Sequence, residues 1–129
     1  MSDEVIRTVD AYLSALVAKD ISAAPLHSDV TFESPLSPLI QGLDAVRQVF
    51  AGFIPAMKGI NVGQHIANGE WCTTLFEMET PFGTLRMVDW FHVVDGRIKS
   101  IRVYFDPRPI VDGLSKTAPA ERHTRSLTA

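Results

Sequence analysis

The chain has 129 residues, which is enough for one domain with a single sizeable core. Hydrophobic residues make up 46% and charged residues 21%, the ordinary balance of a soluble globular protein. The net charge of −3 gives no broad attraction to nucleic acid or to an anionic membrane, and the single cysteine excludes an intramolecular disulfide and a cysteine metal cluster.

The sequence carries no recognisable targeting or membrane segment. Residues 1–4 lack a basic start followed by an apolar run. No later run approaches the roughly 20 apolar residues of a spanning helix. We therefore expect a soluble, cytoplasmic protein with neither a membrane nor a nucleic acid as its partner.

Two amphipathic helices are predicted in the first half of the chain. Residues 3–19 carry apolar side chains at three- and four-residue spacing, and Tyr12 lies on that apolar face. Residues 43–54 repeat the pattern and end before Pro55 and Gly59. Between them we predict a short helix over 21–26, a short strand over 29–35, and a loop from there to Gly42.

Four strands are predicted in the second half, over residues 60–67, 71–80, 85–94 and 97–105. Asn68-Gly69 and Asp95-Gly96 are strong hairpin signals, and the segment 81–83 forms the turn between them. An antiparallel meander that follows separate helices indicates the α+β class. Residues 1–110 are predicted to form the domain, and 111–129 a tail whose last dozen residues are mobile.

One carboxylate, Asp89, stands among apolar side chains in the third of these strands. Burying a carboxylate is costly, so such a residue has a partner or a chemical task. If Asp89 points inward, strand alternation points Met87 and Phe91 inward as well. Val103 and Phe105 share the inner face on the next strand.

The order of elements resembles the nuclear transport factor two superfamily, which includes SnoaL-like polyketide cyclases, ketosteroid isomerases and limonene epoxide hydrolases. The resemblance covers residues 3 to about 107 and rests on YLSAL at 12–16, DVTFESP at 29–35, GLDAV at 42–46, VDWF at 88–91, DGRI at 95–98 and YFD at 104–106. It implies a curved sheet around a cone-shaped pocket that the first helix closes. It also implies a homodimer through the outer sheet face.

The resemblance implies roles for individual residues. Tyr12 and Asp89 match the tyrosine and the protonated aspartic acid with which ketosteroid isomerases stabilise an oxyanion. Ser34 stands where those enzymes carry their aspartate base. At the limonene epoxide hydrolase positions, Leu75 replaces the arginine, Val103 replaces one aspartate, and Phe32 and Ser34 replace the water-holding pair. Glu77 matches the other aspartate, an inward position in that family.

We therefore predict a cofactor-independent acid/base enzyme, without a metal site, that isomerises or cyclises a hydrophobic carbonyl compound. Asp89 is the neutral donor and Glu77 the base, or the reverse, with Tyr12 polarising the oxygen. The predicted lining is Phe32, Ser34, Leu75, Met87, Phe91, Val103 and Phe105.

Other interpretations of these residues stay open. Tyr12 and Asp89 could be structural hydrogen-bonding groups, and a one-residue bulge would turn Glu77 outward. The protein could also be a non-catalytic module that binds an apolar ligand or forms oligomers. A further alternative is a hydrolase or dehydratase in which Glu77 activates water.

Overall fold

The computed structural model describes residues 2–117. Its helices are α1 (Ser2–Val17), α2 (Leu43–Phe53) and α3 (Arg108–Thr117), with short 3-10 helices η1 (Ile21–Ala23) and η2 (Ile54–Ala56). Its strands are β1 (Leu26–Ser34), β2 (Ser37–Gln41), β3 (Gly59–Asn68), β4 (Trp71–Thr80), β5 (Gly83–Val94) and β6 (Arg97–Tyr104). None of the helices in this range combines the length and the hydropathy needed to span a membrane.

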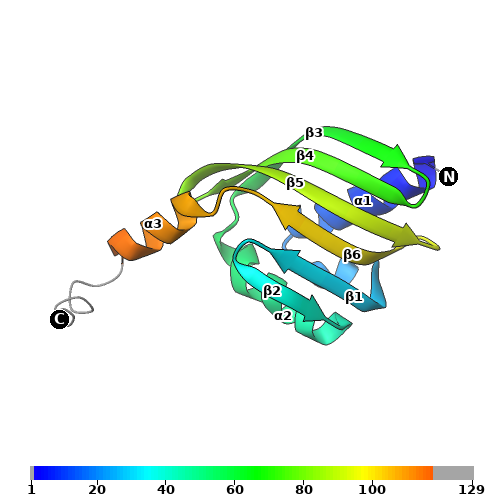
Figure 1. Cartoon of the computed structure of the whole chain (residues 1–129), viewed down its shortest axis with the longest axis horizontal. Coiled ribbons are helices and arrows are strands. Elements are labelled where there is room, and N and C mark those ends of the chain that lie inside the picture. Colours follow the sequence, from blue (N-terminus) through cyan, green and yellow to red (C-terminus); the bar gives the residue numbers. More distant parts are fainter. Residues whose placement is uncertain (1, 118–129) are drawn as a thin grey trace.

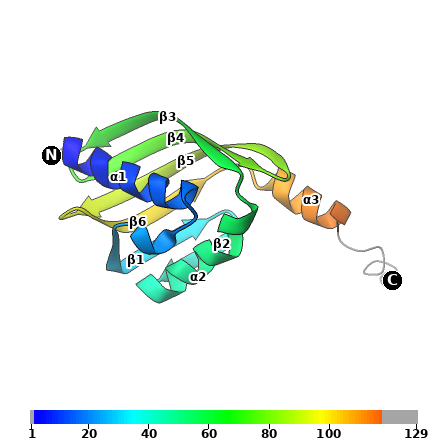
Figure 2. The same ribbon diagram turned by 180° about the vertical axis from the view of Figure 1, so that it is seen from behind.

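The six strands form one curved sheet in the order β2-β1-β6-β5-β4-β3 (Figure 1). β1 and β6 run parallel, and the other neighbours run antiparallel. Helices α1 and α2 lie against the same face of this sheet (Figure 2). The predicted α+β class, with a curved sheet around the N-terminal helices, is confirmed.

The predicted meander from β3 to β6 depends on tight turns between its strands. At the β5–β6 turn, Asp95 has a φ of 51° and Gly96 a φ of 73°. Positive φ at both central residues defines the turn whose twist matches that of paired strands, and an Asp-Gly pair adopts it readily. The turn therefore fixes the register in which β5 and β6 pair.

A short strand occupies part of the segment that the sequence analysis predicted to be a loop. β2 pairs antiparallel with β1, with Phe32 opposite Ile40 and Thr31 opposite Gln41. β2 is an edge strand, and an edge strand tolerates a proline such as Pro38 because one side of its backbone has no strand to bond. The loop prediction was wrong for residues 37–41.

A helix occupies the start of the predicted tail. α3 crosses the expected domain boundary at residues 110 and 111, and Ile110 packs against the core. The ring of Phe82, in the β4–β5 turn, lies so close to Gly113 that a Cβ there would overlap it. The predicted mobility of the last dozen residues concerns positions outside the described residues.

The core fills the space between the helices and the inner sheet face, and Phe50 of α2 lies at its centre. Phe50 has an exposed fraction of 0%. Its ring meets those of Phe32, Phe53 and Tyr12 edge-on, with centroid separations of 5.1, 5.1 and 5.9 Å. Phe50 therefore joins α2 to both α1 and β1.

Replacing Phe50 tests this packing. We expect Phe50→Ala to lower the free energy of unfolding by about 3–5 kcal/mol, because it removes buried apolar area and leaves a cavity. Leu39→Ala is the control: Leu39 is 59% exposed, and its replacement should change stability by less than about 0.5 kcal/mol. Urea denaturation measures both. A loss below about 1 kcal/mol for Phe50→Ala would contradict the described core.

Candidate functional site

A cavity of about 420 Å³ lies between the inner sheet face and the helices. Most of its lining is apolar, from α1, α2, strands β1, β4, β5 and β6, and α3. The polar side chains among its described lining residues are Tyr12, Ser34, Ser37, Thr80 and Asp89. Asp89 is the carboxylic acid of this set.

Asp89 lies on β5 and points inward, as the matched ketosteroid isomerase position implied, and Met87 and Phe91 share this face, as strand alternation then predicted. Its exposed fraction is 2%, and its Oδ1 atom is buried without a hydrogen-bond partner among the described residues. Burial away from water disfavours the charged carboxylate, so the pKa of Asp89 is raised well above its usual value. The neutral acid is therefore the resting form that the surroundings favour.

Tyr12 of α1 lines the same cavity and is 1% exposed. Its ring packs edge-on against that of Phe91, with centroids 5.3 Å apart, and against Phe50. Burial and, to a lesser degree, the nearby Asp89 carboxyl raise the pKa of Tyr12 well above its usual value. The phenol consequently keeps its proton and can act as a hydrogen-bond donor inside the cavity.

Glu77 and Leu75 do not face this cavity, so their predicted inward orientation was wrong. Both are exposed on the outer sheet face, and Glu77 pairs with Arg86 of β5. Directly opposite residues of an antiparallel pair share a face, and Thr74 rather than Leu75 stands opposite the inward Asp89. The cavity therefore does not contain the predicted pair of carboxylates, because Glu77 lies outside it. A hydrolase in which Glu77 activates water in this cavity is excluded for the same reason.

The other predicted lining residues divide into two groups. Phe32, Ser34, Met87, Val103 and Phe105 line the cavity. Phe91 is fully buried on the inner face and supports the ring of Tyr12 instead of lining the cavity.

Several lining residues were missing from the predicted site. Phe76 and Met78 of β4 line the cavity in place of Leu75 and Glu77. The alternation of these two apolar residues with Glu77 and Glu79 was a sequence signal for this orientation. The apolar face of the second helix was another signal, since it brings Val49, Phe50 and Phe53 to the cavity. Ile110 and Leu114 also line the cavity, and their four-residue spacing was a signal for a helix at this position.

The family of the chain follows from comparison with known proteins. The family model of the SnoaL-like domain matches residues 9–101, which is more than half of the chain. The chain belongs to the SnoaL-like domain family. A search of the curated proteins found no match.

Solved structures share this fold at low sequence identity. A nuclear transport factor two-like protein of Cytophaga hutchinsonii ATCC 33406 is 24% identical, with 83% of this chain and 94% of that chain covered and a TM-score of 0.73. An LEH-like epoxide hydrolase of M. tuberculosis is 24% identical, with coverages of 89% and 92% and a TM-score of 0.71. At these identities the similarity establishes the SnoaL-like fold and leaves the reaction open.

The carboxyl of Asp89 should leave a signature in the pH dependence of stability. In the unfolded chain an Asp side chain has a pKa of about 4 and releases its proton above that pH. In the folded state the Asp89 carboxyl keeps its proton at these pH values. The parent therefore loses stability through Asp89 as pH rises from about 4. We expect Asp89→Asn, which has no such proton, to gain stability relative to the parent between pH 4 and pH 7.

Urea denaturation of both proteins at the two pH values measures this difference. Glu77→Gln is the matched control, because Glu77 lies on the exposed outer face. A stability difference between parent and Asp89→Asn that is the same at both pH values would show that Asp89 ionises normally.

Proposed function

We propose that this protein is a cofactor-independent acid/base enzyme for a hydrophobic, carbonyl-bearing small molecule, with isomerisation or cyclisation as its reaction type. The observation that supports this most is the Asp89 carboxyl, which lines an apolar cavity together with a protonated Tyr12 and whose Oδ1 atom has no hydrogen-bond partner among residues 2–117. A carboxyl held in this way has a high proton affinity, and so its conjugate base is a strong one.

The proposed mechanism needs one carboxyl group. The Tyr12 hydroxyl donates a hydrogen bond to the carbonyl oxygen of the substrate. Asp89, as the carboxylate, removes a proton from the carbon beside the carbonyl, and the electron pair of that C–H bond moves to give an enolate. The Tyr12 hydrogen bond strengthens as negative charge develops on the oxygen. Protonated Asp89 then returns the proton at another carbon, which completes an isomerisation.

This mechanism changes the assignment expected from the sequence. Glu77 was the expected base, and its position on the outer face removes it from the reaction. Asp89 takes the role of the base, and Tyr12 is the donor to the oxygen. Ser34 lines the cavity and remains a substrate-binding residue in the proposal.

The lining of the cavity supports an apolar substrate with one polar group. Apolar side chains, including Phe32, Phe76 and Met87, make up most of the wall, and cavities of a few hundred Å³ suit small organic ligands. The substrate proposed here is therefore a mainly hydrocarbon molecule whose carbonyl lies at Tyr12 and Asp89.

Binding without turnover is a second candidate function. It is favoured by the presence of one carboxyl group among the described lining residues, and by Ser34 at the position where ketosteroid isomerases carry their base. In that case Tyr12 and Asp89 would hold the carbonyl of a ligand as two hydrogen-bond donors.

We also propose that the outer sheet face mediates a homodimer. Trp71, Leu75 and Tyr104 on this face are 40%, 41% and 51% exposed. Trp71 stacks on His92 with centroids 4.2 Å apart and packs against Trp90. Aromatic and apolar side chains gathered on one face are typical of protein–protein contact surfaces.

The reaction is tested with a panel of β,γ-unsaturated ketones. We expect Asp89→Asn to lower kcat/KM by about 10²–10⁴-fold, since it removes the group that transfers the proton. Tyr12→Phe should lower kcat by about 10²–10³-fold, since it removes one donor to the oxyanion. Glu77→Gln is the control and should match the parent. Turnover that survives both cavity substitutions would contradict the mechanism, and tight binding without turnover would favour the second candidate.

The oligomeric state is tested by sedimentation velocity. Tyr104→Lys places a charge on the proposed contact face and should shift the parent dimer towards monomer at equal concentration. Leu39→Lys, at an exposed position on β2, is the control and should remain dimeric. A monomeric parent at high concentration would contradict the proposed dimer.

A further inference from the structure

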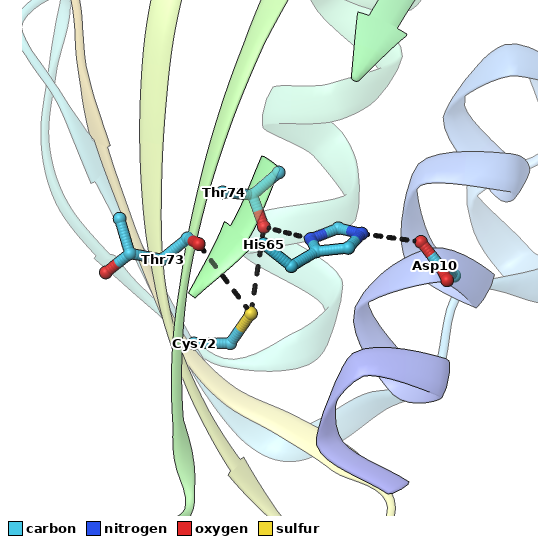
Figure 3. A network of polar contacts seen from close by, with 5 residues as sticks. All are labelled: Asp10, His65, Cys72, Thr73 and Thr74. Carbon is cyan, nitrogen blue, oxygen red and sulfur yellow. Dashed lines mark hydrogen bonds and ion pairs between the residues drawn. The ribbon is translucent and has the colours of Figure 1, made fainter. Parts of the chain in front are cut away.

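Four residues on neighbouring elements lie in one row behind the cavity. His65 of β3 is directly opposite Thr74 of β4, and Thr74 is directly opposite Asp89 of β5. The other side of His65 reaches Asp10 of α1. Figure 3 shows the His65 ring between Thr74 and Asp10. The row connects the exposed end, Asp10, to the buried carboxyl that the proposed mechanism uses.

Two short hydrogen bonds join three residues of this row, Thr74, His65 and Asp10. His65 Nδ1 lies 2.8 Å from Thr74 Oγ1, and His65 Nε2 lies 2.8 Å from Asp10 Oδ1. A carboxylate accepts hydrogen bonds, so Nε2 carries the proton that points to Asp10. In a neutral ring Nδ1 then accepts, and the Thr74 hydroxyl donates to it. The lone pairs of Thr74 Oγ1 stay available to a further donor.

Asp89 stands directly opposite Thr74, and a rotation of its carboxyl group would make it that donor, since no hydrogen bond joins the two side chains in this structure. Directly opposite side chains in an antiparallel pair have Cβ atoms about 4.5–5.5 Å apart, a distance that short polar side chains can bridge by rotation. Thr74 has an exposed fraction of 0%, so water does not compete for its hydroxyl. The Oδ1 atom of Asp89 has no hydrogen-bond partner in the part of the chain that the structure describes.

We propose that Thr74, His65 and Asp10 form a proton relay that takes the proton from Asp89 and so converts it into the base. This inference rests on the proposed function, because it supplies the carboxylate that the reaction needs. Asp89 transfers its proton to Thr74 Oγ1, and Thr74 passes its own proton to His65 Nδ1. The products are an Asp89 carboxylate and a His65 imidazolium, and no proton leaves the protein.

The surroundings of the row favour this charge distribution. The imidazolium would lie against the Asp10 carboxylate, which stabilises it, and both its N–H groups would have acceptors. The Asp89 carboxylate would accept the hydrogen bond of Thr74. Tyr12 from α1 and Val103 from β6 also lie beside Asp89.

One further group contacts the relay. The Cys72 thiol lies 3.8 Å from Thr74 Oγ1, and burial raises the pKa of this thiol. Cys72 therefore keeps its proton and leaves the charge balance of the row unchanged. In this relay Thr74 and His65 are positioning residues, because they act on the substrate through Asp89.

The relay is tested on the parent protein with ¹³C-labelled aspartate. The Asp89 carboxyl signal is assigned with Asp89→Asn and followed against pH by NMR. We expect Thr74→Val, which keeps the shape but removes the hydroxyl, to move the Asp89 ionisation to higher pH. It should leave about tenfold less carboxylate at a fixed pH, the effect of one hydrogen bond to a charged group. Thr74→Ser keeps the hydroxyl and should titrate as the parent does.

A second variant covers the case in which Thr74→Val does not fold. Asp10 is 57% exposed, so Asp10→Asn should fold normally and move the Asp89 ionisation in the same direction. An Asp89 curve that is unchanged in either folded variant overturns the relay. This readout does not use turnover: a shifted curve without activity refutes the proposed function, and activity with an unchanged curve refutes the relay.

Discussion

The constraint on which this site depends is the burial of one carboxyl group without a partner. Asp89 is held between β4 and β6 in the middle of the sheet, and its Oδ1 atom has no hydrogen bond among the described residues. Leaving such an oxygen unpaired costs about 1–3 kcal/mol. The protein stays folded only if other interactions offset this free energy, and the packing around the fully buried Phe50 and Phe91 does so.

The same burial determines both the kind of ligand that the cavity favours and the protonation of the acids inside it. An apolar cavity favours a hydrocarbon ligand, and it also raises the proton affinity of any acid inside it. Tyr12 and Asp89 are therefore both protonated when the cavity is at rest. A catalytic cycle then needs a route by which Asp89 loses its proton, and the hydrogen-bonded row through Thr74 and His65 is such a route.

Hydrophobic periodicity predicted the two long N-terminal helices and the strands of the meander, and the resemblance to ketosteroid isomerases implied the inward direction of Asp89. The predicted orientation of β4 was wrong. The matched hydrolase position implied an inward Glu77, whereas the alternation of Phe76 and Met78 with Glu77 indicates that the two apolar residues point inward. β2 was missed because it is short and contains Pro38. α3 was missed although Ile110 and Leu114 stand at helical spacing, because Pro109 and Gly113 are weak helix formers.

The pairing of His65 with Thr74 depends on a register that the sequence does not specify. The register of β3 against β4 shifts between Val62 and Gln64, so that Gly63 is an extra residue. Without that shift Gln64 would stand opposite Thr74, and His65 would point to the outer face. A network of this kind is found only when the strand pairing is known.

The central claim is that the Asp89 carboxyl is neutral inside the folded protein at neutral pH. Infrared difference spectroscopy between the parent and Asp89→Asn, with ¹³C-labelled aspartate, observes this group directly. Our account predicts that the parent shows the C=O stretching band of a protonated carboxylic acid, and that this band is absent in the variant. A difference spectrum with carboxylate bands and no protonated acid band at neutral pH would contradict it.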